Sequence, residues 1–303
     1  MNQKRRVIAL GFFDGVHLGH GSLLRQVKQR STQLQATASV MSFDIHPSAL
    51  LMGRSVPLIN TVEDRVWLMR NRYAMEDVIL AHFDQRMMHQ PWERFVADYL
   101  VEELGAVHVV AGHDYRFGDH GTGNAQRLRS KCAELGIGCD ILGMVELDGE
   151  AVHSTHIRRL LSQGNMEEAN RFLGHPHTFS ATVGQGKGLG HVLGFPTVNL
   201  QFPPDLLIPA FGVYAAKVYV DGVCYLAAAN IGVRPTVEDS NKVNLEAFLL
   251  DYHGDLYGKE LRIEFFHHLR GEKKFPSVEA LTAEVLRNAE QVREYFSQRE
   301  ELL

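Results

Sequence analysis

Up to about residue 173, short apolar runs alternate with segments whose apolar residues recur at helical spacing. The apolar runs are VIAL (7–10), ASVMSF (38–43), VILAHF (78–83), VHVVAG (107–112) and ILGMV (141–145). The segments between them are LLRQVKQR, VEDRVWLMRNRY, WERFVADYLVEEL and AQRLRSKCAEL. This alternation predicts an α/β fold, in which a doubly wound parallel sheet carries helices on both faces. The ligand crevice of such a sheet lies at the carboxyl ends of its strands.

After GHPHTF (174–179) the pattern changes to paired strands with tight turns. The segment VYAAKVYVDGVCYLAAANIG contains Asp221-Gly222, a strong hairpin signal, and further strands are predicted in VNLEAFLLDY and KELRIEFF. A final helix is expected after Ser277, its predicted N-cap. One face of that helix carries Val278, Leu281, Val285, Ala289, Val292 and Phe296. We therefore expect an antiparallel β-barrel with a C-terminal helix, and two domains at residues 1–175 and 176–303.

Composition narrows the class of protein. The 303 residues are 45% hydrophobic and 22% charged, which suits two domains with substantial cores. A net charge of −5 argues against broad binding of nucleic acid or membrane surfaces, so any phosphate site must be local. No segment is long and apolar enough to span a bilayer, and the apolar start is predicted to be a strand rather than a signal peptide. Three scattered cysteines without a CxxC pair favour reduced thiols and a cytoplasmic protein.

The stretch LGFFDGVHLGH (10–20) follows the first predicted strand and contains the first candidate site. It holds Gly11, Gly15, Gly19, His17 and His20. The glycines let backbone amides approach an anion, the next helix offers its positive N-terminal end, and imidazoles can donate hydrogen bonds to phosphoryl oxygens. A metal site that includes Asp14 is the alternative, although the HExxH arrangement of common zinc hydrolases is absent.

A second phosphate element is predicted in VHSTHIRRLL. Ser154 and Thr155 would cap a helix there, and Arg158 lies one turn further on. Hydroxyls, unpaired amides and a guanidinium all suit a phosphate. Taken alone, these residues fit an ordinary capped helix with a solvent-facing arginine better.

The glycine-rich stretch VGQGKGLGHVLGFPTVNL is the third candidate. Thr197 and Asn199 lie two apart on an extended chain, so they point to the same side and can offer oxygen ligands to Mg²⁺. Lys187 is close enough in sequence to join a phosphate-binding loop, although this is not a P-loop. Glu246, within an apolar strand, is a candidate base for an alcohol nucleophile. The alternatives are glycines that mark barrel corners and a glutamate that faces solvent.

The motifs of the first half resemble a known family. His17-Leu18-Gly19-His20 fits the HxGH element of the nucleotidyltransferase superfamily, which has a Rossmann-like sheet, and Ser154 to Arg158 fits most of its ISSTxxR element. GFFDGVHLGHGSLL, VVAGHDYRFGDHGTG and HSTHIRRLLSQGN are similar to the adenylyltransferase module of prokaryotic bifunctional riboflavin kinase/FMN adenylyltransferases, also called FAD synthetases. The sequence departs from that family at Phe12, where Asn is usual, and at His153, where Ser is usual.

This resemblance implies a reaction in which the FMN phosphate attacks the α-phosphorus of ATP and pyrophosphate leaves. His17 and His20 would stabilise the transferring phosphoryl group, while Ser154, Thr155 and Arg158 hold the β- and γ-phosphates. The resemblance also places further residues at the nucleotide or the flavin: Gly11, Asp14, Gly19, His46, Asp114, Arg116 and Phe117.

The second half resembles the riboflavin kinase module through GKGLGHVLGFPTVNL, NIGVRPTV and EAFLLDYHGDLYGKELRIEFFHHLRGEKKF. In that family the corresponding residues imply that Thr197 and Asn199 bind Mg²⁺ and ATP phosphates and that Glu246 activates the ribityl 5′-hydroxyl. The residues implied at the nucleotide or the flavin are Lys187, Gly188, Gly194, Pro196 and Arg270. Departures are His191 where Arg is common, Phe248 where His is frequent, and Gly271 where an acidic residue is frequent.

Together the two resemblances predict an enzyme that makes FMN from riboflavin and FAD from FMN, with ATP as co-substrate and Mg²⁺ as cofactor. The expected partners are small-molecule flavins and ATP, without nucleic acid or membrane, on a monomer or weak homo-oligomer. Two alternatives stay open at this point. One is a riboflavin kinase with a degenerate first domain, and the other is a non-catalytic flavin-binding regulator.

Overall fold

The computed structural model describes residues 4–53, 56–184, 197–233 and 243–300. The chain forms two compact units, one made of Met1–Leu58 and Val62–Ser154 and the other of Ile59–Thr61 and Thr155–Leu303. No helix among the described residues has the length and apolarity needed to cross a membrane.

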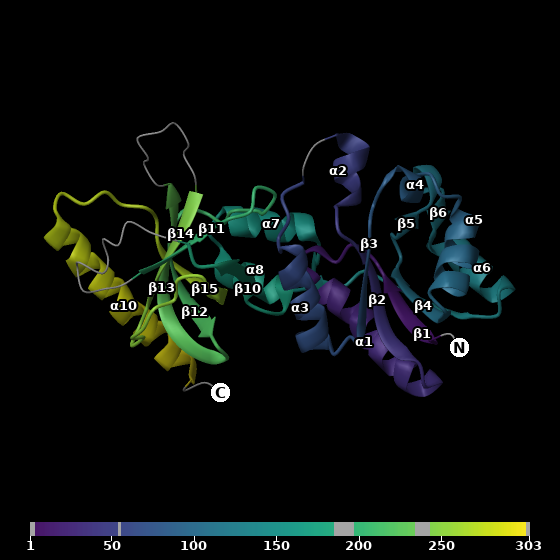
Figure 1. Cartoon of the computed structure of the whole chain (residues 1–303), viewed down its shortest axis with the longest axis horizontal. Coiled ribbons are helices and arrows are strands. Elements are labelled where there is room, and N and C mark those ends of the chain that lie inside the picture. Colours follow the sequence, from purple (N-terminus) through teal and green to yellow (C-terminus); the bar gives the residue numbers. More distant parts are fainter. Residues whose placement is uncertain (1–3, 54–55, 185–196, 234–242, 301–303) are drawn as a thin grey trace. The chain divides into compact units, whose positions relative to one another are not determined.

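The first unit is built on a five-stranded sheet in the order β3-β2-β1-β4-β7, in which all neighbouring strands are parallel (Figure 1). The strands are β1 (Arg6–Leu10), β2 (Thr37–Phe43), β3 (Asp77–Ala81), β4 (Ala106–Gly112) and β7 (Gly138–Leu142). The predicted parallel sheet is confirmed. The fifth strand was expected at 141–145 and lies three residues earlier, because Gly138 to Leu142 pair with His108 to Gly112.

Helices cover both faces of this sheet, as predicted. On one face α1 (Leu18–Leu34) and α3 (Val62–Tyr73) pack with Val7 and Ala9. On the other face the π-helical η2 (Phe95–Glu103) and α6 (Ala125–Glu134) pack with Ile8 and Leu10. Alternate residues of β1 therefore face opposite cores, as the pleat of a strand requires.

The shorter elements of the first unit are η1 (Asp14–Val16), α2 (Pro47–Met52), α4 (Gln85–Met88), α5 (Trp92–Arg94), β5 (Arg116–Phe117), η3 (Asp119–Gly121), β6 (Gly123–Asn124), β8 (Glu146–Leu147) and β9 (Glu150–Ala151).

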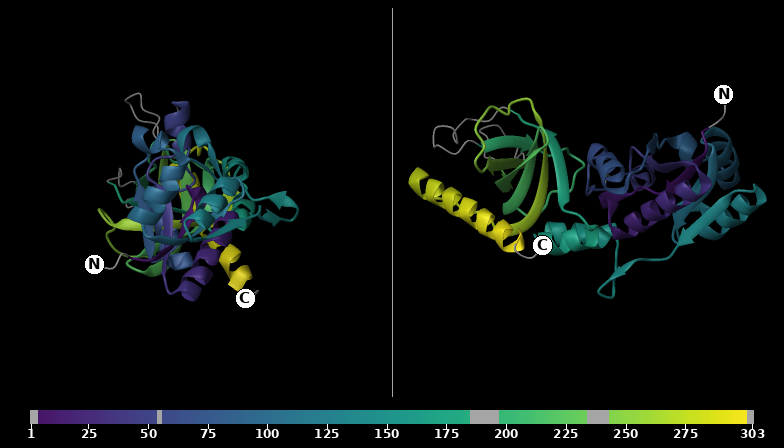
Figure 2. Two further views of the ribbon diagram at one scale, coloured as in Figure 1. Left: turned by 90° about the vertical axis from the view of Figure 1, so that its right-hand side faces the viewer. Right: turned by 90° about the horizontal axis from the view of Figure 1, so that it is seen from below.

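The second unit contains a six-stranded antiparallel sheet in the order β10-β15-β12-β13-β14-β11. Figure 2 shows the strong curvature of this sheet. Its strands are β10 (His177–Thr182), β11 (Thr197–Gln201), β12 (Gly212–Val220), β13 (Val223–Val233), β14 (Val243–Leu249) and β15 (Glu260–Arg270). A bridge between Gly184 and Asn199 links the chain just after β10 to β11, at the other edge of the sheet. The sheet therefore curls toward closure, in agreement with the predicted barrel. Asp221 and Gly222, with φ of 49° and 84°, form the predicted tight turn between β12 and β13.

Three helices accompany the barrel: α7 (Ser154–Ser162), α8 (Met166–Leu173) and α10 (Val278–Glu300). The Oγ of Ser277 accepts a hydrogen bond from the backbone N of Ala280 at 3.2 Å, which confirms the predicted N-cap of α10. The predicted apolar face of α10 is buried only in its second half, at Ala289, Val292 and Phe296, whereas Val278 is 47% exposed.

A charged network ties α1 to the edge strand β7. Asp140 on β7 accepts hydrogen bonds from Arg30 Nε at 2.7 Å and from Gln26 Nε2 at 2.6 Å, and His108 Nε2 lies 3.1 Å from the same carboxylate. Partial burial raises the pKa of Asp140, but the donated hydrogen bonds of Arg30 and Gln26 outweigh it and lower that pKa to about 2. The ionised carboxylate is thus the form that the folded unit stabilises.

We expect Asp140→Asn to lower the free energy of unfolding of the first unit by about 1–3 kcal/mol, because the donors of Arg30 and Gln26 lose a charged acceptor. The contribution should be complete above the unfolded carboxyl pKa of about 4 and should be lost as pH falls toward the folded value. Chemical denaturation at several pH values measures both effects. Asp98→Asn, at an exposed position of η2, is the matched control, and equal stability of Asp140→Asn and the wild type at pH 7 would contradict the prediction.

Candidate active sites

The first candidate site lies where the strand order of the parallel sheet reverses. The chain passes from β1 to β2 and β3 on one side and then returns to β4 on the other side of β1. In sheets of this topology, ligands bind at the carboxyl ends of the strands beside such a reversal, here next to the loops that follow β1 and β4. These loops are GFFDGVH and HDYRFG, the two segments that sequence analysis selected about 100 residues apart.

His17 is the N-cap of α1. Its Nδ1 accepts a hydrogen bond from the backbone N of His20 at 3.3 Å, and its carbonyl accepts one from Gly21 N at 2.8 Å. Because Nδ1 serves as the acceptor, the neutral ring carries its proton on Nε2. His17 is therefore locked in the tautomer that can donate to a phosphate oxygen.

His20 lies directly against His17, and the two rings stack with centroids 3.6 Å apart and planes at 15°. Burial lowers the pKa of His20 well below its usual value, and the charges of His17 and Arg65 lower it further. The buried Nδ1 of His20 has no hydrogen-bond partner among the described residues. A buried polar atom of this kind is costly unless something else bonds to it, which is what a ligand site provides. The structure thus brings the predicted histidine pair together.

The loop that carries these histidines has an unusual backbone. Phe13, Gly15 and Val16 have φ of 61°, 80° and 41°, and the two non-glycine residues are fully buried. Left-handed backbone is unfavourable for β-branched and bulky residues and persists where the surroundings impose it. A Cβ on Gly19 would lie 3.2 Å from the His17 ring, so glycine there leaves room for the imidazole.

The second phosphate element begins beside this loop. The hydroxyl of Ser154, the first residue of α7, donates to the carbonyl of Asp14 at 3.0 Å, and Asp14 is only 3% exposed. Thr155 and Arg158 follow on α7 and belong to the second unit. Their predicted role at the β- and γ-phosphates stays a prediction.

His46 repeats the arrangement of His17. It is the N-cap of α2, and its Nδ1 accepts a hydrogen bond from Ser48 N at 3.1 Å, so the neutral ring again carries its proton on Nε2. The ring of Phe12 meets it edge-on at 4.5 Å.

The loop after β4 separates the residues expected there. Arg116 is exposed in the short β5–β6 ladder, and Gly112, where a Cβ would lie 3.0 Å from Asp114 Oδ1, leaves room for that carboxylate. Phe117 is 7% exposed and stacks on Tyr115 at 5.4 Å. The predicted contacts of Asp114, Arg116 and Phe117 with a ligand stay predictions.

The second candidate site is a polar row on the barrel. Asn199 on β11 pairs with Glu246 on β14, which pairs in turn with Asn230 on β13. Residues opposite each other in an antiparallel ladder point to the same side of the sheet, and Thr197, two residues before Asn199, shares that side. The intervening residues face the core: Val198, Leu200, Leu245, Ala247, Ala229 and Ile231 are all buried. Thr197, Asn199 and Glu246 therefore share the outer face of the sheet, and all three are half-buried.

Two asparagines that sequence analysis missed complete this row. Asn244 Nδ2 donates to Asn199 Oδ1 at 3.0 Å and lies 3.5 Å from Glu246 Oε1, while Asn230 lies directly opposite Glu246. The period-two spacing of Asn244 and Glu246 was visible in the sequence, but the register that adds Asn230 was not. A pocket opens beside Thr197 and is lined in part by Val183, Leu249, Tyr252 and Tyr257.

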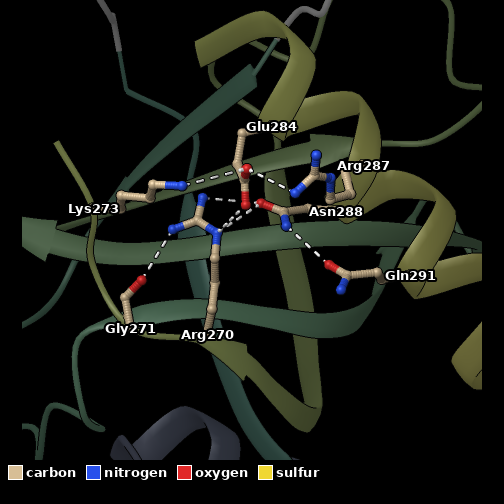
Figure 3. Close-up of polar contacts among 7 residues, drawn as sticks. All are labelled: Arg270, Gly271, Lys273, Glu284, Arg287, Asn288 and Gln291. Atoms are coloured by element: carbon tan, nitrogen blue, oxygen red, sulfur yellow. Dashed lines mark hydrogen bonds and ion pairs between the residues drawn. The ribbon is translucent and has the colours of Figure 1, made fainter. Parts of the chain in front are cut away.

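Arg270, at the end of β15, is held by α10 (Figure 3). Its Nε and Nη2 donate to Asn288 Oδ1 at 3.2 and 3.0 Å, and its Nε lies 3.2 Å from Glu284 Oε1. Its Nη1 donates to the carbonyl of Gly271 at 3.0 Å. Glu284 also attracts Lys273 at 3.9 Å and Arg287 at 3.7 Å, so one carboxylate gathers three cations. The contacts fix the guanidinium and the start of the segment that follows β15.

Comparisons with known proteins cover both units. A family model described as FAD synthetase matches residues 1–156, and one described as riboflavin kinase matches residues 173–296. A curated bifunctional riboflavin kinase/FMN adenylyltransferase of Listeria monocytogenes is 36% identical over 298 residues, which cover 98% of this chain and 94% of that protein. The chain belongs to this bifunctional family. The prediction made from the two sets of motifs is confirmed.

Other members of the bifunctional family support the assignment. The protein of Pseudomonas fluorescens is 35% identical and covers 91% of this chain and 88% of its own, and that of Bacillus subtilis is 31% identical with coverages of 97% and 94%. A crystal structure from Streptococcus pneumoniae, described as a macrolide-efflux protein, is 28% identical with a TM-score of 0.84 and covers 97% of this chain and 95% of that one. Its similarity extends through both family-model regions.

Some predicted residues of the kinase half lie outside the described residues, namely Lys187, Gly188, Gly194 and Pro196. Within the described part of the chain, one further cluster has the donors of a cation site. It consists of His89, Asp119 and His120, whose ligand atoms lie within 4.8 Å of one another. All three are at least partly exposed, and neither candidate active site contains them.

Proposed function

We propose that this chain phosphorylates riboflavin to FMN on the barrel and adenylylates FMN to FAD at the parallel sheet, with ATP in both steps. The observation that carries the proposal is the pair of sites on one chain. Stacked His17 and His20 lie at the switch point of the sheet, and Asn199 and Glu246 lie side by side on the barrel.

In the adenylyl transfer, a phosphate oxygen of FMN attacks the α-phosphorus of ATP, the bond to the β-phosphate breaks, and pyrophosphate leaves. Nε2–H of His17 donates to the phosphoryl oxygens, and His20 adds a second donor beside it. Fixed donors that match the developing charge are an effective means of lowering such a barrier. Backbone amides around Gly11 and Gly19, the Asp14 loop and His46 complete the nucleotide side.

The phosphate tail and the flavin complete the first site. Ser154, Thr155 and Arg158 hold the β- and γ-phosphates, because hydroxyls and a guanidinium at the start of a helix suit an anion. Asp114 and Arg116 line the flavin side. Phe117 supports that loop from the core, where it packs on Tyr115.

In the kinase reaction, Glu246 takes the proton of the ribityl 5′-hydroxyl, whose oxygen attacks the γ-phosphorus of ATP, and ADP leaves. Thr197 and Asn199 present oxygen ligands on the same face as Glu246, a donor set that fits Mg²⁺. When bound, the ion neutralises phosphate charge. Lys187, Gly188, Gly194 and Pro196 bind the nucleotide, and Arg270 closes the flavin side.

The remaining expectations are part of the same proposal. The adenylyltransferase domain comprises residues 1–175 and the kinase domain residues 176–303. The protein acts in the cytoplasm as a monomer or weak homo-oligomer. Nucleic acid takes no part, in keeping with the net charge of −5.

Chromatography of flavins after incubation of the purified protein with riboflavin, ATP and Mg²⁺ tests the proposal. We expect FMN to appear first and FAD to follow, and FMN supplied alone with ATP to yield FAD. If the product stops at FMN, the first site is degenerate and the chain is a kinase only. If riboflavin and FMN both remain unchanged, a flavin-binding regulator explains the chain better.

The contacts of Asn288 and Glu284 with Arg270, here called the clamp, lead to a prediction for riboflavin binding. Glu284→Gln keeps the shape of the side chain but removes the charge that Arg270, Lys273 and Arg287 share. We expect KM for riboflavin to rise by about 10-fold, because one lost charge-assisted contact of a positioned group is worth about 1.4 kcal/mol or more. Steady-state kinetics of FMN formation measures it.

Two controls sharpen this experiment. Glu290→Gln removes a carboxylate that is 78% exposed on the same helix and should leave KM unchanged. Conversion of FMN to FAD by Glu284→Gln should stay at the wild-type rate. An unaltered KM for riboflavin in Glu284→Gln would show that the clamp does not serve the flavin site.

A further inference from the structure

A buried cation lies beneath the histidine loop. Arg65 on α3 is 1% exposed and is the largest fully buried side chain among the described residues. Its Nη1 donates to the carbonyl of Phe12 at 2.5 Å, and its Nη2 donates to the carbonyl of Phe43 at 2.7 Å. Phe43 ends β2, and Phe12 lies two residues after β1. One guanidinium therefore joins the carboxyl ends of two neighbouring strands at the edge where the first site lies.

The ring of Phe12 also contacts Arg65 and His46. The guanidinium carbon of Arg65 lies 4.1 Å from the centre of the Phe12 ring, and the edge of that ring packs on His46 at 4.5 Å. The carbonyl of Phe12 also accepts a hydrogen bond from Ser42 Oγ at 2.9 Å. Phe12 is thus held from three directions, although it stands where the family usually has Asn.

The charge of Arg65 acts on the same loop. Burial lowers the pKa of Arg65 to about 10, against the opposing influence of Asp14, Asp44 and Glu63, so the group stays charged at neutral pH. Burial of a cation is costly unless hydrogen bonds and opposite charges compensate it, as the carbonyls of Phe12 and Phe43 and the nearby acids do here. A fixed positive charge in a water-poor region acts strongly on nearby phosphates, and it is already oriented before they arrive.

We propose that Arg65 is a positioning residue for adenylyl transfer, which anchors the histidine loop through Phe12 and places a fixed positive charge behind His17 and His20. This inference rests on the proposed function of the first site. Phe12 links the two groups, because its ring packs on the guanidinium of Arg65 and on the ring of His46. The departure from the usual Asn is then compatible with an active site.

Two substitutions separate the anchor from the charge. Arg65→Lys keeps the charge but cannot reach two carbonyls with one planar fork, and Arg65→Gln loses both features. We expect kcat for FAD formation from FMN to fall on the order of 10-fold in Arg65→Lys and 100-fold in Arg65→Gln. Losses of this size are typical when reacting groups are held slightly out of place. KM for FMN should change less than kcat. Arg70→Lys, exposed on the same helix, should match the wild type.

The kinase activity of the same chain is the internal control. FMN formation from riboflavin should stay at the wild-type rate in every variant, which shows that the second unit is folded and that ATP is supplied; a melting experiment reports on the first unit. If the first unit of an Arg65 variant unfolds in a melting experiment, Phe12→Leu replaces it, since this change removes only the ring. We expect FAD formation to fall several-fold in Phe12→Leu.

The pH profile of FAD formation distinguishes a positioning role from a purely structural one. The charged groups that act on His20 among the described residues are His17 beside it and Arg65 from α3. Arg65 lowers the pKa of His20, so Arg65→Gln should move the apparent pKa of the profile upward, while Arg65→Lys should not. Wild-type kcat and an unshifted profile in Arg65→Gln would overturn the inference. Absence of FAD with the wild type would instead overturn the proposed function.

Discussion

Substitution of His17 by Asn should lower the rate of FAD formation from FMN by about 10²–10³-fold, the usual effect of removing one donor aimed at a developing charge. Asn is chosen because it is a favoured N-cap residue and can accept the backbone N–H that His17 Nδ1 accepts now. The helix start is thereby kept, while the Nε2–H donor and the stack of its ring on His20 are lost. Initial rates of FAD formation with saturating FMN and ATP measure the effect.

The second histidine and two controls complete this experiment. His20→Ala should give a loss of similar size, and the double variant should lose less than the product of the single effects, because the rings stack and act on one phosphoryl group. His82→Ala, at a side chain that is 66% exposed, should match the wild type. FMN formation should continue in all variants. FAD formation at the wild-type rate in His17→Asn would remove the histidine pair from the mechanism.

Substitution of Glu246 by Gln should lower the rate of FMN formation from riboflavin by about 10²–10⁴-fold, the range for loss of a general base. The amide keeps the size of the side chain and its place opposite Asn199 and Asn230, but it cannot take a proton. The change also removes a carboxylate from the neighbourhood of the proposed Mg²⁺ ligands. Conversion of FMN to FAD should be unaffected.

The kinetic pattern identifies the role of Glu246. A fall in kcat with little change of KM for riboflavin indicates proton transfer, whereas a higher requirement for Mg²⁺ with unchanged kcat would assign Glu246 to the ion instead. Glu260→Gln, at an exposed position that begins β15, is the matched control and should match the wild type. Wild-type FMN formation in Glu246→Gln would place the base elsewhere.

The order of strands and helices was predictable because it depends on local periodicity. Alternating apolar runs and amphipathic segments indicated the parallel sheet, and Asp221-Gly222 marked the hairpin of the barrel. The position of the last parallel strand was not predictable to the residue, since pairing with β4 rather than the apolar run decides where it begins.

The chemistry of the sites was predictable to the extent that it resides in short motifs. His17 and His20 lie within one turn of helix, and Thr197 and Asn199 lie two apart on one strand, so their spacing alone places each pair on one side. In the structure, the rings of His17 and His20 stack, and Thr197 and Asn199 lie on one face of β11, as expected. Glu246 is 47 residues from Asn199 in sequence, and its place in the kinase site was inferred from family resemblance rather than from spacing.

The sequence by itself therefore determined the two folds, their order and the family, and it supplied the residues that we propose for the chemistry. Only the tertiary structure decided what holds those groups. The two carbonyls that Arg65 joins, the asparagines that flank Glu246 and the clamp of Asn288 and Glu284 on Arg270 all depend on contacts between elements that are distant in the chain. The sequence does not distinguish a buried arginine from one on an exposed helix, or an asparagine at a site from one on a surface strand. The role of each is set by the dielectric and the neighbours that folding creates around it.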